Sequence, residues 1–359
     1  MPSKQESDRK EMEKLLNGLH AKYDIPQDDS PREFVSTGLM ALDMATCRGG
    51  IPRGLLMDLY GDEGLGKTSL VLTMIAERIR CGERCAFIDV EKRLDQNMID
   101  MLVPGHNMGK KNSMLELFRP TDGDNALTVV ESILQFPEFR MMAIDSVSAL
   151  VFTDMTEADK HTEPIGILAR RMSTHTKRIM EPIFRNNTIM ILINQIRAQM
   201  NFRGQVSFVP TGGRAIKFFS SLRISLHRGE FIGPKEKPLG QKLRLRIDKN
   251  SFGPPFREAS ASLVYGSGFD TTRDMIDVGI ELGVINQAAS WMTYTDTDEK
   301  GAVNEIRAHG EADLAEKLKP IAERVKARIH AKMAEIAKIA KMAETKVEEV
   351  PGGQEPVEE

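Results

Sequence analysis

One eight-residue segment, residues 61–68, constrains the fold of this chain more than any other. It reads GDEGLGKT, which matches the pattern GxxxxGK(S/T), and it lies between the apolar run 55–60 and an amphipathic stretch over residues 69–80. In such a strand–loop–helix, glycines let successive backbone N–H groups turn toward phosphate oxygens, and the start of the helix adds the positive end of its dipole. We therefore predict a phosphate-binding loop within an α/β domain.

The side chains of this loop indicate a nucleoside triphosphate accompanied by a divalent cation. Lys67 is expected to reach the β- and γ-phosphates, and the Thr68 hydroxyl is expected to bind Mg²⁺. The nucleotide-binding residues predicted in this segment are Gly61, Asp62, Glu63, Gly64, Leu65, Gly66, Lys67, Thr68 and Ser69.

Short apolar runs alternate with helical stretches from about residue 34 to residue 270. The apolar runs are 55–60, 85–90, 141–144 and 189–193. This alternation is typical of βαβ units and predicts a doubly wound, mainly parallel sheet. Two later runs, 222–226 and 243–247, alternate apolar with polar residues. They predict half-exposed, antiparallel strands at the end of that sheet.

The N-terminal residues 1–33 are predicted to form an oligomerisation helix and a linker. Apolar residues follow helical spacing over residues 8–23, and the polar, proline-containing segment 24–32 separates them from the main body. The apolar stripe requires a packing partner. That partner is either the core of the same chain or a neighbouring subunit.

The C-terminal part divides into a small domain and a tail. Residues 271–343 are expected to form a helical domain, because apolar residues recur every three or four positions over 321–343. The basic side chains between them either contact DNA phosphates or form a solvated face. The last segment, residues 344–359, is rich in glutamate and is predicted to be a disordered acidic tail.

Composition excludes several classes of protein. The net charge of −3 argues against a protein that grips nucleic acid through overall positive charge, so any DNA site must be local. The 3 cysteines include no CxxC pair, so neither a disulfide framework nor a zinc site is indicated. The sequence shows no signal peptide and no apolar run of membrane-spanning length. We expect a cytoplasmic protein without a membrane partner.

Polar residues follow three of the apolar runs at the edge where ligands collect in a parallel sheet. Asp145 follows the run 141–144 and is the candidate for a second metal-binding group. Glu91 and Asp89 both lie at the end of the run 85–90, and either can position an attacking water. Gln195 follows the run 189–193, where it is expected to hydrogen-bond the γ-phosphate.

Together these motifs resemble the bacterial RecA family, from about Lys4 to Tyr294. The strings that carry the resemblance are STGLMALD (36–43), CAFIDVE (85–91), IDSV (144–147), INQIR (193–197) and TGGRAIKF (211–218). The resemblance implies a RecA-like ATPase core over residues 34–270. It identifies Lys67, Thr68 and Asp145 with the family's Walker residues, Glu91 with its catalytic glutamate, and Gln195 with its γ-phosphate switch.

The resemblance also implies an activity and partners. The family's members are DNA-dependent ATPases that form helical filaments on single-stranded DNA and exchange strands with homologous double-stranded DNA, in recombination and repair. Two loops are expected to bind DNA, residues 153–164 and 196–214. The first is acidic, so it either inserts between bases or contacts a neighbour. The expected DNA-binding residues are Arg170, Lys177, Arg197, Arg203, Gly212, Gly213 and Arg214, while Lys217 and Arg223 serve either DNA or the subunit interface.

Two departures from the family pattern affect the nucleotide site. Met98 stands where the family has a tyrosine that stacks on adenine, although Asp95 can still accept a hydrogen bond from the base. Lys249 matches the first of two lysines that reach ATP across the subunit boundary, whereas the second falls on Ser251. Loss of one cation predicts slower or less DNA-dependent hydrolysis. The departures indicate a divergent lineage, for which a bacteriophage version is one candidate.

Two other functions are compatible with parts of the pattern. A hexameric helicase would use the same ATPase core to translocate along nucleic acid. A non-catalytic DNA-binding or mediator protein would use nucleotide only structurally, and Glu91 argues against this alternative.

Overall fold

The computed structural model describes residues 32–106, 113–152, 164–200, 206–297 and 303–348, together with Lys10, Met12, Lys14 and Leu15. The chain divides into two compact units, Met1–Glu33 and Phe34–Glu359. In the first unit, Lys10, Met12, Lys14 and Leu15 are helical and exposed. The rest of the predicted amphipathic helix lies outside the described residues.

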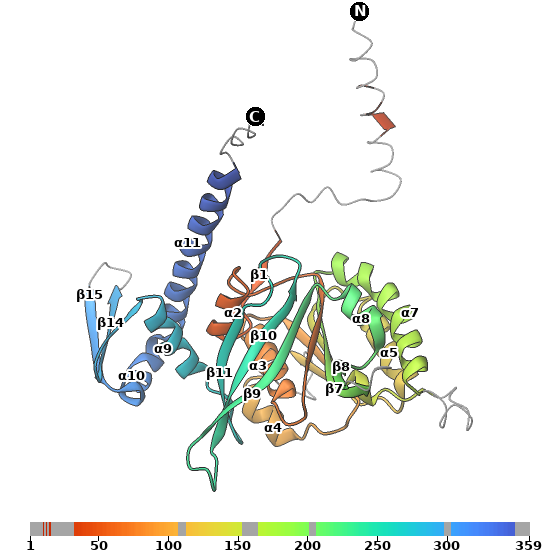
Figure 1. Cartoon of the computed structure of the whole chain (residues 1–359), viewed down its shortest axis with the longest axis horizontal. Helices are drawn as coiled ribbons and strands as arrows, with labels where there is room; N and C mark the ends of the chain where they lie inside the picture. Colours follow the sequence, from red (N-terminus) through yellow and green to blue (C-terminus); the bar gives the residue numbers. More distant parts are fainter. Residues whose placement is uncertain are drawn as a thin grey trace, which may run out of the picture. The chain divides into compact units, whose positions relative to one another are not determined.

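A ten-stranded sheet forms the core of the second unit (Figure 1). Six strands are parallel to one another. Five of them lie in the order β3 (Leu55–Gly61), β7 (Ile189–Met200), β6 (Phe139–Asp145), β4 (Arg84–Asp89) and β5 (Leu115–Phe118), and the sixth, β9 (Leu222–Ile232), pairs with β3 on its other side. Beyond β9 the sheet continues with β10 (Gly240–Asn250), β11 (Glu258–Val264) and β12 (Gly268–Phe269).

The predicted mainly parallel α/β sheet is confirmed. Strand β9 pairs with β10 in the antiparallel sense as expected, but it is parallel to β3, and residues 222–226 are buried rather than half-exposed because β9 lies inside the sheet between β3 and β10.

Apolar side chains on both faces of the central strands explain why helices cover the sheet on two sides. In β3, Leu55, Met57 and Leu59 join one buried cluster and Leu56 joins the other. Such continuous apolar runs are typical of parallel strands buried on both faces. The first cluster includes residues of α2 (Met40–Ala45), α3 (Lys67–Arg80) and α4 (Gln96–Leu102), and the second includes residues of α5 (Gly123–Ile133), α7 (Pro164–Arg185) and α8 (Gly213–Phe219).

The strand register brings the predicted site residues to one edge of the sheet. Gly61 of β3 lies opposite Gln195 of β7, and Asp89 of β4 lies opposite Asp145 of β6. Because these strands are parallel, their carboxyl ends meet at the same edge. The short elements β1 (Phe34–Val35), β2 (Ile51–Pro52) and η1 (Val147–Ala149) complete this part of the chain.

The C-terminal part is not purely helical, which corrects the prediction for residues 271–343. Besides α9 (Thr271–Glu281), α10 (Glu311–Leu318), η2 (Lys319–Ile321) and α11 (Ala322–Glu348), it contains a three-stranded antiparallel sheet. The strands are β13 (Ile285–Ala288), β14 (Trp291–Thr297) and β15 (Val303–His309). Met292 and Tyr294 are buried while Trp291 is exposed, so β14 shows the two-residue alternation of a half-exposed strand.

Helix α11 extends into the predicted acidic tail. It ends at Glu348, so residues 344–348 are helical, and residues 349–359 lie outside the described part. Its first half packs through Val325, Ile329 and Met333 into a buried cluster with α9 and the three-stranded sheet. No helix within the described ranges combines the length and apolar character needed to cross a bilayer.

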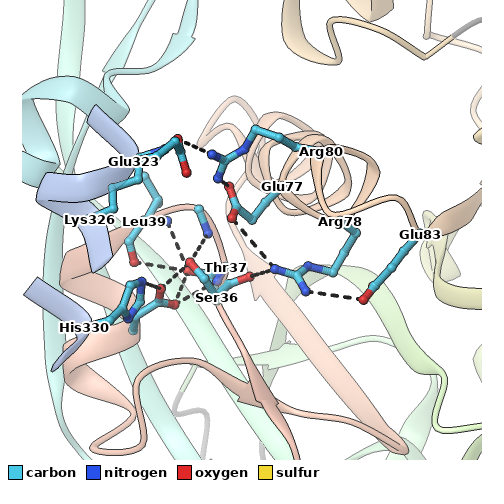
Figure 2. A network of polar contacts seen from close by, with 12 residues as sticks. Ser36, Thr37, Leu39, Glu77, Arg78, Arg80, Glu83, Glu323, Lys326 and His330 are labelled. Carbon is cyan, nitrogen blue, oxygen red and sulfur yellow. Dashed lines mark hydrogen bonds and ion pairs between the residues drawn. The ribbon is translucent and has the colours of Figure 1, made fainter. Parts of the chain in front are cut away.

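A polar network joins α11 to the part of the chain that contains the ten-stranded sheet. Figure 2 shows Glu323 of α11 facing Arg80 at the end of α3, and His330 facing the segment that precedes α2. Arg78 of α3 donates to the carbonyl oxygen of Ser36 (3.2 Å), which ties α3 to the same segment. The carboxylate of Asp274 in α9 accepts hydrogen bonds from the first backbone N–H groups of α2.

Candidate nucleotide-binding and catalytic site

The phosphate-binding loop connects β3 to α3, as predicted from its sequence context. Gly66 has φ +68° at the N-cap of α3, and a Cβ there would lie 2.7 Å from the Leu263 side chain. Gly64 has φ +72°, and a Cβ there would meet no atom within 4 Å. Both conformations favour glycine. The loop is therefore open on the Gly64 side, which leaves room for a ligand against its backbone.

Lys67 folds back over this loop. Its Nζ donates to the carbonyl oxygens of Gly61 (2.8 Å) and Asp62 (2.6 Å). Burial lowers the pKa of Lys67, and the nearby carboxylates of Asp145 and Glu91 oppose this effect. The ammonium group thus lies across the loop where phosphates would bind, with carbonyl partners that a phosphate can replace.

Thr68 and Asp145 form the other half of the phosphate site. The Thr68 hydroxyl donates to Oδ2 of Asp145 (2.5 Å). Burial raises the pKa of Asp145 to about 6, although the hydrogen bond from Thr68 lowers it. The peptide bond from Asp145 to Ser146 is cis.

The donor set at this position fits Mg²⁺ rather than a metal held by protein alone. Within the described ranges, no cluster of three or more His, Cys, Asp or Glu side chains could hold a metal ion. Magnesium usually binds one or two carboxylates and completes its shell with water and substrate phosphates. The Thr68 hydroxyl and the Asp145 carboxylate match that requirement.

Glu91 and Gln195 are brought together next to this pair. Oε1 of Glu91 accepts from Nε2 of Gln195 (3.2 Å) and from the Ser146 hydroxyl. Oε2 of Glu91 lies 3.0 Å from the Arg93 guanidinium. A carboxylate at the end of β4 thus contacts residues that follow β6 and lie in β7.

Asp89, the alternative to Glu91, has a different set of partners. Its two carboxylate oxygens accept from the backbone N–H groups of Arg93 and Leu94, at 3.2 Å each. Arg119 lies 3.5 Å away, and Asp89 is only 1% exposed. Its carboxylate therefore supports the turn after β4, while Glu91 is the carboxylate that contacts Gln195.

Asp95 and Met98, which stand where contacts with adenine are expected, lie at the end of the turn after β4 and at the start of α4. Asp95 is exposed and is the N-cap residue of α4, where its side chain accepts from the backbone N–H of Met98 (2.7 Å). Met98 is half-buried against the apolar cluster that contains α3. Ser69 lies in the first turn of α3, immediately after Thr68.

The second predicted DNA-binding loop contains regular structure. Strand β7 continues to Met200 and pairs with β8 (Val206–Pro210) as an antiparallel ribbon. This corrects the expectation that the strand ends near Gln195, because pairing with β8 satisfies the backbone beyond the parallel sheet. Arg203 and residues 153–163 of the predicted first loop, 153–164, lie outside the described residues, and Pro164 begins α7.

The other expected DNA-binding side chains are exposed. Arg170, Lys177, Arg197 and Arg214 all lie at the surface. Gly212 and Gly213 have φ of +84° and +78°, and a Cβ on Gly213 would lie 2.7 Å from the Ala169 side chain. This close approach to α7 requires glycine at the start of α8.

Lys249, expected to reach ATP across the subunit boundary, and Arg223, expected to serve either DNA or the interface, both have partners within the subunit. Nζ of Lys249 donates to the carbonyl oxygen of Phe218 at the end of α8 (2.9 Å). Arg223 is 7% exposed and pairs with the buried Asp58 (2.9 Å). Lys217 is exposed.

Sequence reasoning missed Ser146, Arg93 and Arg119 as parts of the site. The position of Ser146, directly after Asp145 at a strand end, is a signal that was present in the sequence. Arg93 and Arg119 gave no such signal, because their contacts depend on the course of the turn after β4.

Comparisons with known proteins match most of the chain. Residues 20–270 match the family described as the RecA N-terminal domain. The chain is similar to proteins named RecA from Campylobacter jejuni subsp. jejuni strains 81-176 and 81116 and from subsp. doylei strain 269.97. Each is 33% identical over 274 residues, which cover 76% of this chain and 77% of the relative.

Proposed function

Because the chain belongs to the RecA family, we propose that it is a DNA-dependent ATPase that forms filaments on single-stranded DNA and exchanges strands with homologous double-stranded DNA. Such an activity serves DNA recombination and repair. The observation that carries this proposal is the contact between Glu91 and Gln195 beside the Thr68–Asp145 pair. It joins a candidate base, a candidate phosphate sensor and a candidate metal site.

In the proposed ATP hydrolysis, each side chain of the site has a separate role. Lys67 exchanges its carbonyl partners for the β- and γ-phosphates, and Thr68 and Asp145 hold Mg²⁺. Magnesium, when bound, neutralises charge on the phosphate oxygens. Glu91 accepts the proton of the attacking water, and Gln195 donates to the γ-phosphate. Lys249 of an adjacent subunit adds a cation from across the boundary.

The path of β7 supports a coupling between nucleotide and DNA. Gln195 belongs to the strand that continues into the ribbon with β8. Asn194 donates to the carbonyl oxygen of Thr211 (2.8 Å), which fixes the far end of this segment. We propose that a γ-phosphate held by Gln195 orders this segment in its DNA-binding form and that hydrolysis releases it, which is an order–disorder switch.

The remaining parts of the chain receive roles within the same proposal. Residues 1–33 dock on an adjacent subunit, residues 34–270 form the ATPase core, and residues 271–343 capture duplex DNA. The acidic tail, residues 344–359, restrains duplex entry until Mg²⁺ screens its charge. The loop 153–164 and the basic residues Arg170, Lys177, Arg197, Arg203 and Arg214 bind the DNA.

One experiment tests the central coupling. The affinity of the purified protein for a single-stranded oligonucleotide is measured without nucleotide, with ADP and with a non-hydrolysable ATP analogue. We expect the tightest binding with the analogue, because only that ligand offers a γ-phosphate to Gln195. Equal affinity in the three states would contradict the proposal. Electron microscopy of the analogue complex separates open helical filaments from the closed rings of a helicase.

A further inference from the structure

Arg93 contacts the proposed catalytic base, yet the proposed function gives it no task. Its guanidinium lies 3.0 Å from Oε2 of Glu91. The Arg93 side chain is 74% exposed, whereas the Glu91 side chain is 12% exposed. The carboxylate of Glu91 is therefore largely buried, and the Arg93 cation lies on its solvent side.

The turn after β4 fixes the backbone from which Arg93 reaches Glu91. Lys92 adopts a left-handed conformation with φ +57°, and the Asp89 carboxylate accepts from the backbone N–H groups of Arg93 and Leu94. Leu94 is buried, and Arg119 donates to its carbonyl oxygen (2.6 Å). Hydrogen bonds thus hold the backbone at Arg93 and Leu94, and the Arg93 side chain reaches back to the carboxylate of Glu91.

The other oxygen of Glu91 is already engaged from the interior. Oε1 accepts from Gln195 and Ser146, and the backbone N–H of Glu91 donates to the Asp145 carbonyl oxygen (3.2 Å). Under the proposed function, Oε2 is therefore the oxygen left to accept the proton of the attacking water. In this structure it faces Arg93 instead.

A cation in contact with a carboxylate opposes uptake of a proton by that carboxylate. A general base must take up a proton from the attacking water during hydrolysis. We propose that Arg93 is a positioning residue that holds Glu91 through Oε2 and suppresses hydrolysis until this ion pair is broken. This inference rests on the proposed ATPase function.

The exposure of Arg93 makes such a restraint reversible. An ion pair with one partner mostly in water contributes little free energy and weakens as salt is added. DNA binding at the β7–β8 ribbon, which the proposed function couples to Gln195, would change the position of Glu91 and needs to overcome only this weak contact. The restraint therefore acts chiefly on the DNA-free protein.

The test compares Arg93→Ala, Arg93→Gln and Arg93→Lys in the full-length protein. We expect the kcat for DNA-free ATP hydrolysis to rise roughly two- to fivefold in the Ala and Gln variants, the range that a pair of this exposure can supply. The KM for ATP stays near the wild-type value, and Arg93→Lys retains the wild-type rate. A rise in kcat at an unchanged KM, reversed by the conservative Arg93→Lys change, is an effect that a purely structural residue would not produce.

Arg185→Ala is the matched control. Arg185 is also exposed, and it pairs with Glu181 (3.4 Å) at the end of α7. Its loss removes one surface cation and one ion pair, but it leaves the DNA-free rate unchanged. Added salt should raise the DNA-free rate of the wild type relative to that of Arg93→Ala.

A measurement without turnover tests the ion pair itself. Thermal unfolding of the nucleotide-free protein is compared for Arg93→Ala, Glu91→Gln and the double variant. If the pair exists, the two Tm shifts are not additive, because either substitution alone removes the contact. Additive shifts would overturn the inference.

Three further outcomes are informative. A lower kcat or at least tenfold weaker binding of a non-hydrolysable ATP analogue in Arg93→Ala would overturn the inference, because Arg93 would then act on phosphate. An unchanged DNA-free rate would also overturn it, while hydrolysis that still depends on Glu91 leaves the proposed function intact. A wild-type protein that hydrolyses no ATP with or without DNA would overturn both.

Discussion

His330 of α11 lies 3.8 Å from Asp43 of α2, so a histidine from the C-terminal part faces a fully buried aspartate of the ATPase core. Asp43 also accepts from the hydroxyl groups of Ser36 (2.5 Å) and Thr37 (2.7 Å). Burial nevertheless raises the pKa of Asp43 to about 7. The contact between the two parts of the chain therefore contains a carboxyl group that titrates near neutral pH.

We predict that Asp43 makes stability decrease as pH rises toward neutrality. The native protein binds a proton at Asp43 more tightly than the unfolded chain does, so this stabilisation is complete below about pH 3.8 and is lost as pH rises through about 7. One such group changes the free energy of unfolding by up to about 1.4 kcal/mol per pH unit. His330, whose pKa is lowered by burial, acts in the opposite direction. Asp274 acts in the same direction as Asp43, because burial raises its pKa to about 7.

Urea unfolding at several pH values checks this prediction. Asp43→Asn should flatten the dependence of the unfolding free energy on pH between about 4 and 7. Parallel curves for Asp43→Asn and wild type would show that Asp43 does not titrate in this range.

Substitutions of Asp89 and Glu91, the two carboxylates at the end of β4, are predicted to have different effects. Glu91→Gln should lower kcat by about 10²- to 10⁴-fold, the usual contribution of a general base, while binding of an ATP analogue changes little. Asp89→Asn should chiefly lower Tm, because Asp89 accepts backbone N–H groups of the turn. Steady-state kinetics combined with thermal unfolding separates these effects. Loss of hydrolysis in a stable Asp89→Asn variant, with Glu91→Gln still active, would reverse the assignment.

How far the sequence predicts this site depends on how each contact is built. Gly61, Asp145 and Gln195 were predicted to meet because parallel strands end at one edge, and strand register places them there. The contact of Arg93 with Glu91 depends on a left-handed residue, Lys92, that no local pattern signals. Such contacts form only once the turn has its three-dimensional course.

The same distinction applies to the fold. The central sheet follows from continuous apolar runs, whereas β14 and β15, which are of similar length, contain many polar residues. The ribbon of β7 and β8 was missed because its segment resembles a loop in composition, and only pairing between the strands reveals it. The burial of Arg223 depends on Asp58, which lies far away in the sequence.

Arg197→Ala and Arg214→Ala are predicted to weaken single-strand binding with a smaller salt dependence. Both side chains are exposed at the ends of the segment that contains the β7–β8 ribbon. Each phosphate contact removed should reduce the slope of log K against log salt by about 0.7. Fluorescence anisotropy between 50 and 300 mM salt, roughly the range in which such slopes are resolved, provides the measurement. Arg185→Ala serves as the control, and wild-type slopes in both variants would argue against DNA contacts there.

Removal of residues 349–359 is predicted to increase duplex binding at low Mg²⁺. The cut lies after the end of α11 at Glu348, so it removes glutamates without shortening the helix. The difference from the full-length protein should disappear as Mg²⁺ screens the tail. A second truncation, of residues 344–359, shows whether the last turn of α11 contributes. If both truncated proteins bind duplex like the full chain at every Mg²⁺ concentration, the tail does not restrain duplex entry.

Ser251→Lys is predicted to increase DNA-dependent hydrolysis. Ser251 is exposed, and its backbone N–H donates to the Ser221 carbonyl oxygen (2.9 Å), so a longer side chain fits without disturbing this contact. A second cation beside Lys249 should stabilise the transition state across the subunit boundary and raise kcat by about tenfold. Ser251→Met supplies similar length without charge and should remain near the wild-type rate. Because the cation acts on a neighbouring subunit, the gain should vanish in dilute, DNA-free protein, and an equal gain in Ser251→Met would assign the effect to packing instead.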